Sequence, residues 1–355
     1  MISNKLLFQN LVTLNWTDGK WLKMINHFKL FGYKALNFLA FMLITPIFYA
    51  QEYPKLSEEF LLERLRPNNG KLNVVIDTDT YNEIDDQFAV VYALLSPEKI
   101  NVEAIYAAPY FNTRSVGPAD GMIKSHEEIL RLMNKMGMNH QGLVYKGSED
   151  FIKSNKQPLQ SDAAKDLVNR AMASDGPLYV LALGAPTNIA SAILMEPKII
   201  NKIIVVWLGG KGLNWDTAYE FNLKQDMVSS KILFDSGVPL IQVPTEPVSS
   251  HLLTTIPELD TYLKGQGEIG DYLIDIFKNY HKDHYAYSKI IWDIAVIAYV
   301  LNPSWFKSEI RHAPILTDQI TYSIDNSRHF YRLVTYLNRD KIFGDMFRKI
   351  QNLNR

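Results

Sequence analysis

The 355-residue sequence contains no cysteine. That absence excludes disulfide bonds, thiolate chemistry and zinc sites built on cysteine, although it does not fix the cellular compartment. The net charge is also close to zero, because the sequence has 37 basic and 38 acidic residues. No basic patch stands out, so we expect no nucleic-acid partner. The length permits one large α/β domain or two smaller ones.

Long apolar runs are scarce as well. The run at residues 35–49 (ALNFLAFMLITPIFY) is shorter than the ~20 apolar residues of a spanning helix. Lys20, Lys23, Lys29 and Lys34 precede it, and a basic flank is typical of a secretory signal. We therefore predict that residues 1–50 are a signal peptide and that the protein is exported to the periplasm or the extracellular space, without stable membrane insertion once the signal is cleaved. Phe48 is large for a cleavage site after Ala50, so an uncleaved N-terminal anchor is the alternative.

Residues 51–70 are predicted to be a linker, since they contain Pro54 and the turn sequence PNNG at 67–70. Residues 71–355 are predicted to be the folded catalytic domain. Short apolar runs in it predict strands at 102–108, 178–183, 203–208, 240–243 and 331–336.

The stretch 71–95 (KLNVVIDTDTYNEIDDQFAVVYALL) carries the strongest functional signal. Its apolar run at 72–76 predicts a buried strand, and apolar residues at 88–95 recur at helical spacing. Between them, five acidic residues stand within ten positions. A strand, a loop and a helix in this order place the acids at the carboxyl end of the strand, where open α/β sheets bind ligands. The five are Asp77, Asp79, Glu83, Asp85 and Asp86.

Clustered carboxylates repel one another and resist ionisation unless a cation lies among them. Hard divalent cations take six to eight oxygen ligands, so the cluster indicates Ca²⁺ or Mg²⁺. The alternative is that Asp85 and Asp86 merely stabilise the N-terminus of the following helix. We favour the cation site, because that alternative leaves most of the repulsion uncompensated.

Polar residues elsewhere follow predicted strands in the same way. In the sequence 184–190 (GAPTNIA), Thr187 or Asn188 is expected to cap the next helix. In 214–222 (NWDTAYEFN), an extended backbone would turn the Glu220 and Asn222 side chains to one face, and such groups bind sugar hydroxyls in pairs. Asp293 opens an apolar helix, where it needs either a capping role or a cation.

These motifs resemble those of the nucleoside hydrolases, enzymes similar to the inosine–uridine-preferring hydrolases. That family usually writes its N-terminal signature DTDPGxDD, with three residues between the second and third aspartate, whereas this chain has five, at 80–84. Glu220-Phe221-Asn222 matches the family's E-F-N motif, and Asn214 stands six residues before the glutamate, as the family's asparagine does. Trp292-Asp293 stands where many members have His-Asp. The resemblance covers most of residues 72–353.

The resemblance implies a fold, an activity and a set of roles. The fold is a single α/β domain with a mixed, mostly parallel sheet flanked by helices. The activity is Ca²⁺-dependent hydrolysis of the N-glycosidic bond of ribonucleosides, so the binding partner is a small-molecule nucleoside. The resemblance also implies a homo-oligomer. Trp292 resembles the tryptophan of the purine-preferring branch, which stacks on the base.

The implied site residues fall into three groups. The calcium ligands are Asp79, Asp86, the Leu183 carbonyl and Asp293, with Asp79 also the general base. Substrate contacts fall to Asp85 and Asn222 at the 2′- and 3′-hydroxyls, Asn112 on the ribose, Asn214 and Glu220 toward the 5′ side, and Trp292 on the base. Asp77 supports its neighbours.

The departing base must receive a proton or a hydrogen bond, and tryptophan in the histidine position removes one obvious donor. The candidate donors are Tyr280, His281, His284, Tyr285 and Tyr287. Alternatively, stacking on Trp292 raises the basicity of a purine, and solvent supplies the proton.

Two other functions remain open. Asp77-x-Asp79 after a strand resembles the haloacid dehalogenase-like phosphatases, which use an aspartate nucleophile and Mg²⁺. Those enzymes prefer threonine or valine at the position of Tyr81, and the E-F-N motif has no place in them. The other alternative is an exported ribose or nucleoside binder without turnover, since a binding site does not guarantee catalysis.

Overall fold

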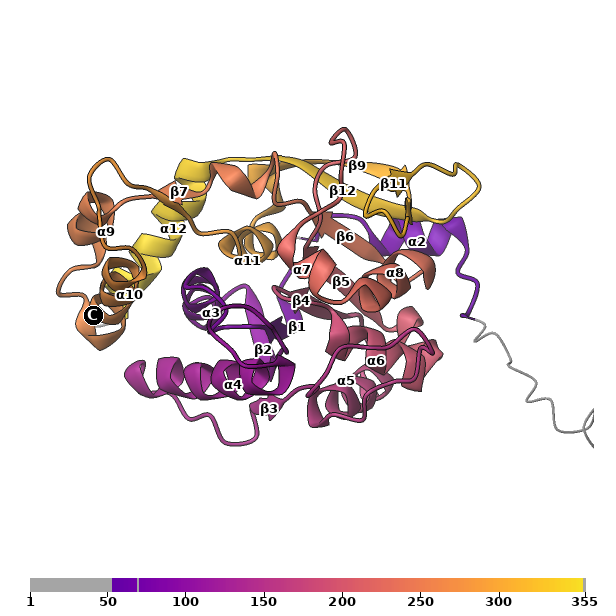
Figure 1. The fold of residues 1–355 in the computed structure, drawn as a ribbon, viewed down its shortest axis with the longest axis horizontal. Helices are drawn as coiled ribbons and strands as arrows, with labels where there is room; N and C mark the ends of the chain where they lie inside the picture. Colours follow the sequence, from indigo (N-terminus) through magenta and orange to yellow (C-terminus); the bar gives the residue numbers. More distant parts are fainter. Residues whose placement is uncertain (1–52, 69, 354–355) are drawn as a thin grey trace, which may run out of the picture. The chain divides into compact units, whose positions relative to one another are not determined.

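A computed structural model describes residues 53–68 and 70–353, all within one structural unit (Figure 1). The predicted signal peptide or anchor at residues 1–50 lies outside the described residues. Within the described ranges, no helix combines the length and the apolar character needed to cross a bilayer.

Eight strands form the central sheet, in the order β3-β2-β1-β4-β5-β6-β12-β9. Neighbouring strands are parallel except at one edge, where β9 runs antiparallel to β12. This arrangement confirms the predicted mixed, mostly parallel sheet. The strands are β1 (Leu72–Thr78), β2 (Ile100–Ala107), β3 (Val144–Lys146), β4 (Leu178–Ala182), β5 (Ile203–Leu208), β6 (Leu240–Val243), β9 (Phe306–His312) and β12 (Phe330–Leu337).

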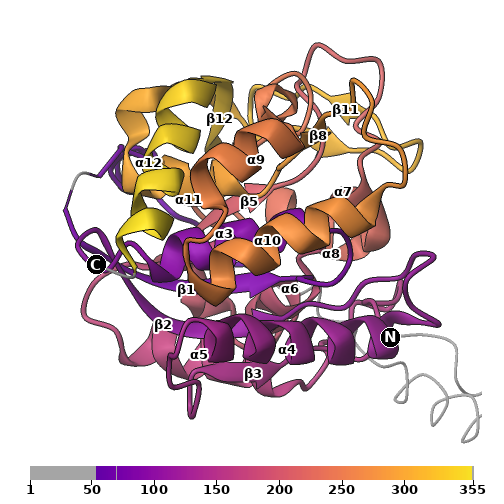
Figure 2. The same cartoon turned by 90° about the vertical axis from the view of Figure 1, so that its left-hand side faces the viewer.

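Helices cover both faces of the sheet (Figures 1 and 2). Along β1, Val74 and Ile76 join one hydrophobic core while Val75 joins the other, since successive side chains of a strand point to opposite faces. Burial on both faces explains why these strands are continuously apolar rather than alternating. The first core contains α3 (Asp85–Leu94), α4 (Pro118–Lys135), α9 (Ile256–Leu263), α10 (Gly267–Tyr280), α11 (Ile294–Leu301) and α12 (Arg339–Asn352), and the second contains α5 (Asp162–Ala173), α6 (Thr187–Met195) and α8 (Met227–Asp235).

Shorter elements complete the fold. The predicted linker at 51–70 contains a helix, α2 (Glu58–Arg64), and its Leu61 side chain is buried in the first core. The linker prediction therefore misses a packed helix. A helix of seven residues is too short to show a clear apolar periodicity in the sequence. The other short elements are α7 (Phe221–Gln225), the pairs β7 (Leu253–Thr254) with β8 (Lys289–Ile290) and β10 (Ile315–Leu316) with β11 (Tyr322–Ser323), and the 3₁₀ turns η1 (Pro197–Asn201), η2 (Ser249–His251) and η3 (Pro303–Trp305).

Candidate functional site

Buried carboxylates from two distant segments meet at the carboxyl edge of the sheet. Asp85 and Asp86 occupy the first turn of α3, and Asp293 immediately precedes α11. One carboxylate oxygen from each of the three lies within 4.8 Å of the other two, and all three side chains are buried. The structure thus joins segments that are about two hundred residues apart in the sequence.

Neither predicted capping role is fulfilled by these aspartates. The residue that caps α3 is Ile84, and no side chain makes a capping hydrogen bond there. Asp293 does stand at the cap position of α11, yet its side chain makes no capping bond either. Capping hydrogen bonds therefore do not account for these carboxylates.

Asp79 lies beside this group, in the loop after β1. It is buried against Gly184, where a Cβ atom added to the glycine would lie only 2.9 Å from the Asp79 Cγ atom. A glycine is therefore required at position 184 for Asp79 to occupy its place. The structure also brings Leu183, the predicted carbonyl ligand, to the same cavity.

The electrostatics of the group favour a bound cation. Burial, reinforced by the Asp85 charge, raises the pKa of Asp86 to about 7, although a hydrogen bond donated by Thr78 opposes the rise. Burial and the neighbouring carboxylates also raise the pKa of Asp79 and of Asp293 well above the usual range. Among the described residues, Asp79 Oδ2 and Asp293 Oδ1 are buried without a hydrogen-bond partner.

A cavity of about 290 Å³ opens beside the carboxylates. Its lining combines the acidic group with the aromatic residues Tyr219, Phe221 and Trp292 and with polar side chains from the loops after β5 and β6. The residues that line it include Asp79, Asn82, Glu83, Asp85, Asp86, Leu183, Lys211, Tyr219, Glu220, Asn222, Thr245, Glu246, Trp292 and Asp293.

The E-F-N motif forms part of this lining at the start of α7. Asn222 Nδ2 donates hydrogen bonds to the carbonyl oxygens of Leu183 at 2.6 Å and Leu208 at 3.0 Å. Glu220 caps α7 and accepts hydrogen bonds from the backbone N–H groups of Gly210 and Asn222, each at 2.9 Å. Asn222 therefore holds the predicted carbonyl ligand in place, while the Glu220 carboxylate is largely engaged with backbone.

Asp77, near the end of β1, is buried and is not among the residues that line the cavity. Burial raises the pKa of Asp77 to about 7, against a hydrogen bond of 2.8 Å from Asn188 Nδ2. Asn188 and Thr187 do not cap α6, contrary to the sequence-based expectation, because Thr187 donates instead to Asp226 at 2.9 Å. Both side chains thus tie α6 to other elements, and the supporting role of Asp77 stays a prediction.

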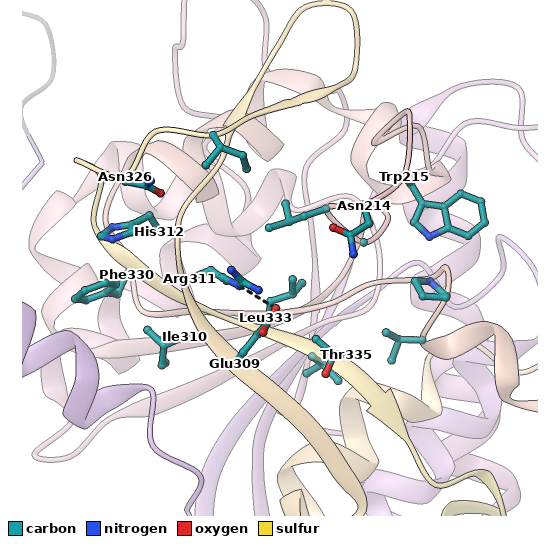
Figure 3. Close-up of a pocket in the computed structure, with 16 residues that line it drawn as sticks. Asn214, Trp215, Glu309, Ile310, Arg311, His312, Asn326, Phe330, Leu333 and Thr335 are labelled. Carbon is teal, nitrogen blue, oxygen red and sulfur yellow. Dashed lines mark ion pairs between the residues drawn. The ribbon is translucent and has the colours of Figure 1, made fainter.

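Two predicted sugar contacts lie outside the cavity lining. Asn112 donates to the Asn82 backbone carbonyl at 3.2 Å, so it holds the acidic loop. Asn214 lines a neighbouring cavity of about 520 Å³ together with Trp215 (Figure 3). A turn closed by the Trp215 N–H on the Gly212 carbonyl at 3.1 Å carries both side chains away from the carboxylates. Spacing within the motif could not reveal this turn.

The longer acidic loop, residues 80–84, is held by cations that sequence reasoning missed. The buried Lys289 ammonium contacts the Glu83 carboxylate and lies 4.5 Å from the centre of the Tyr280 ring. Arg114 donates to the Glu83 carbonyl at 2.8 Å. Burial opposes the charge on Lys289, but the Asp85 and Glu83 carboxylates outweigh it and raise the Lys289 pKa. The signal available in the sequence was an extra glutamate without an obvious partner.

None of the five candidate proton donors lines the cavity. The His281 and Tyr287 rings stack with their centres 4.5 Å apart, and Tyr285 is 91% exposed. Tyr280 lines a separate cavity beyond the acidic loop. By contrast, Trp292 lines the cavity directly, next to Asp293.

An α/β sheet with buried carboxylates and a polar cavity at its carboxyl edge can hold a metal ion beside a small-molecule ligand. The chain belongs to the inosine-uridine preferring nucleoside hydrolase family, whose match spans residues 74–327. The predicted family and the predicted class of enzyme, a hydrolase of ribonucleoside N-glycosidic bonds, are thereby confirmed.

Several known proteins are similar to this chain. A probable uridine nucleosidase 2 from Arabidopsis thaliana is 27% identical over 70% of this chain and 83% of its own length. The pyrimidine-specific ribonucleoside hydrolase RihA from Citrobacter koseri is 26% identical over 69% of this chain and 84% of its own length. Among solved structures, a purine-preferring ribonucleoside hydrolase from Gardnerella vaginalis shares the fold, with a TM-score of 0.63, 18% identity, and coverage of 79% of this chain and 98% of that one.

The raised pKa values predict a cation effect that depends on pH. The Asp86 pKa of about 7 exceeds the ~3.9 of a free aspartate, so between these values the folded state binds more protons than the unfolded state. Stability of the metal-free protein should therefore fall as pH rises through this window. Because a divalent cation replaces the protons, added Ca²⁺ should raise Tm little near pH 5 and much more near pH 7.5, as measured by calorimetry.

Two variants sharpen that measurement. Asp293→Asn should remove most of the Ca²⁺-dependent rise in Tm, whereas Asp120→Asn, at a surface ion pair with Lys124, should leave it intact. An equal rise at both pH values would contradict the electrostatic account.

The Lys289–Glu83 pair predicts a stability effect. Lys289→Met leaves carboxylates without their buried counter-charge, and we expect a cost of about 2 kcal/mol, below the ~3–5 of a fully buried pair because Glu83 is partly exposed. Lys349→Met, at a more exposed pair with Glu98, should cost at most about 1 kcal/mol. Urea unfolding in the presence of chelator measures the free energy of unfolding of both variants. Equal losses in the two variants would contradict a special stabilising role of the Lys289–Glu83 pair.

Proposed function

We propose that the protein hydrolyses ribonucleosides to ribose and free base with Ca²⁺ at the buried carboxylates, and that it prefers purine nucleosides. The observation that supports this most is the meeting of the Asp85, Asp86 and Asp293 carboxylates beside a cavity large enough for a ribose. Export through residues 1–50 and homo-oligomer formation belong to the same proposal on sequence grounds.

The ligand set fits a hard cation. All the available donors are oxygens, from Asp79, Asp86, Asp293 and the Leu183 carbonyl, with Asp85 close by. Ca²⁺ accepts six to eight such ligands, whereas Mg²⁺ demands a tight octahedron and keeps several waters, so the carboxylate-rich set favours Ca²⁺. When bound, the cation supplies positive charge that lowers the pKa of a neighbouring water.

The chain's own residues then account for the chemistry. Cleavage of the N-glycosidic bond builds positive charge on the ribosyl group, and the buried carboxylates stabilise that charge. Asp79 accepts the proton of the attacking water as general base, for which its unpartnered Oδ2 is suited. Asn222 has its Nδ2 committed to two carbonyls, so its Oδ1 remains to accept a sugar hydroxyl, while Asp85 accepts another.

Trp292 supports the purine preference, because a two-ring base covers more of an indole than a one-ring base does. With the five candidate donors outside the cavity lining, we propose that solvent protonates the departing base while Trp292 stacks on it. Two relatives are named for uridine or pyrimidine substrates, so the assay must include both classes. Membership of the family leaves no support for the phosphatase alternative.

A turnover assay tests the proposal against a binder without activity. Purified protein is incubated with inosine, uridine and a nitrophenyl riboside, with Ca²⁺ or chelator, and free ribose is measured. We expect Ca²⁺-dependent release, and Asp79→Asn should lower kcat about 10²- to 10⁴-fold, since general base catalysis contributes that much. Asp120→Asn serves as the surface control. Nucleoside binding without ribose release would establish the binder instead.

Base preference is tested separately at position 292. Trp292→Ala should lower kcat/KM for inosine about tenfold, equivalent to ~1.4 kcal/mol of lost stacking, and lower that for uridine less. Trp292→Phe keeps an aromatic face and should recover part of the loss. Full purine turnover by the Trp292→Ala enzyme would refute the stacking role.

A further inference from the structure

We propose that the separate cavity beyond the acidic loop, called the third cavity below, binds a phosphate group. Its volume is about 410 Å³, and it is lined by residues other than those of the cavity beside the carboxylates. The proposed function makes no use of it. The protein therefore takes a second ligand, either inorganic phosphate or a phosphate monoester.

The acidic loop and the first turn of α3 form the wall between the two cavities. Residues of this short stretch alternate between its two sides. The cavity beside the carboxylates is lined by Asn82, Glu83, Asp85 and Asp86, and the third cavity by Tyr81, Ile84 and Gln87. A ligand in either cavity therefore contacts the same stretch of chain.

Two arginines supply the positive charge of the third cavity. Arg114 donates to the Glu83 carbonyl at 2.8 Å and lies 4.4 Å from the centre of the Tyr81 ring. Neither contact neutralises the guanidinium group, whose fork of N–H donors matches the oxygens of a phosphate. Arg131 lines the same cavity and contacts the Glu128 carboxylate. Two guanidinium groups against one carboxylate leave positive charge uncompensated.

Gln87 favours phosphate over a carboxylate ligand. Its side chain lines the cavity and is only 1% exposed, and its Oε1 is buried without a hydrogen-bond partner in the described part of the chain. Its Nε2 faces the Glu128 carboxylate at 3.4 Å, and because a carboxylate only accepts, Oε1 must point elsewhere.

The unpartnered oxygen needs a donor from the ligand. A phosphate that retains one proton donates to Gln87 Oε1 and accepts from the two guanidinium groups. An ionised carboxylate offers no donor, so it would leave Oε1 unsatisfied.

The remaining lining suits an organic group on the phosphate. Tyr272, Ile276 and Tyr280 come from α10, which faces the viewer with α4 in Figure 2. Aromatic rings beside a charged group can hold the ring of a monoester. The chemistry shared by both ligand sources is the phosphate group.

An anion in the third cavity should strengthen cation binding at the carboxylates. Its charge adds to theirs across the shared wall, and it orders Arg114, which holds the Glu83 carbonyl. By linkage, a cation at the carboxylates strengthens anion binding by the same factor.

The first test is calorimetric binding of two anions to the metal-free protein near pH 6. Wild type should bind inorganic phosphate about tenfold more tightly than sulfate, because sulfate brings no donor to Gln87. Gln87→Met should bring the two Kd values together by weakening phosphate binding alone. A fold defect would weaken both anions equally, so it cannot imitate this result.

Substitutions at the charged groups test the place of binding. Arg114→Gln should weaken both anions about 10- to 100-fold, the contribution of a hydrogen bond to a charged group. Arg64→Gln is the matched control, because Arg64 lies 4.9 Å from the Phe60 ring and lines none of the three cavities.

A second variant leaves the acidic loop untouched. Asn279→Asp adds a negative charge to an exposed residue that lines the third cavity, in the last turn of α10, and should also weaken both anions. Asn352→Asp makes the same change in the last turn of α12, away from the cavity, and should have no effect.

Phenyl phosphate distinguishes the two sources of the phosphate group. Tighter binding than that of inorganic phosphate identifies a phosphate monoester as the ligand, and weaker binding identifies the inorganic ion. Phenyl phosphate should also lower the Ca²⁺ concentration for half-maximal ribose release about fivefold, within the usual range of coupling between sites. Asn279→Asp should abolish this shift.

Three results would overturn the inference. They are the absence of phosphate binding to the wild type, equal affinity for phosphate and sulfate, and affinities unchanged in both Arg114→Gln and Asn279→Asp. Phosphate binding without a shift in the Ca²⁺ requirement refutes the coupling. If the wild type releases no ribose, only the proposed function fails, and the coupling is then read from the Kd for Ca²⁺.

Discussion

The mutual repulsion of buried carboxylates at the carboxyl edge of the sheet is the constraint on which the site depends. Asp79, Asp86 and Asp293 are desolvated and lie close to one another, and their pKa values rise as a result. A fold that carries this electrostatic cost has to offset it with protons or with a cation. The sheet, α3 and α11 provide the rigid support, because their buried apolar residues pack tightly around the acids.

A second layer of contacts keeps the carboxylates at their positions. Asn222 holds the Leu183 carbonyl, Asn188 holds Asp77, and Lys289 with Arg114 holds the lengthened loop through Glu83. The charge that Glu83 adds to the longer loop is therefore balanced by Lys289, which lies elsewhere in the chain. This explains how the loop can be longer than the family's usual signature while Asp85 and Asp86 still begin α3.

The sequence predicted the parts of this structure that depend on local pattern. Apolar runs located β1, β4, β5 and β6, and acids directly after a buried strand located the cavity. The roles of Asn112, Asn214 and Lys289 could not be found in the same way, because they depend on how turns direct side chains and on contacts across about two hundred residues. Likewise, Thr187 and Asn188 have the residue types of helix caps, yet tertiary partners take their hydrogen bonds.

The cavity is chemically asymmetric. The end at β1 carries clustered carboxylates, whereas the end at β5 and β6 carries the Lys211–Glu246 ion pair beside Glu220. In the proposed reaction, the ribose carbon that becomes cationic lies at the acidic end, where the carboxylates stabilise its charge. Trp292 adjoins Asp293 in the cavity lining, so the proposed stacking places the base next to the same carboxylates.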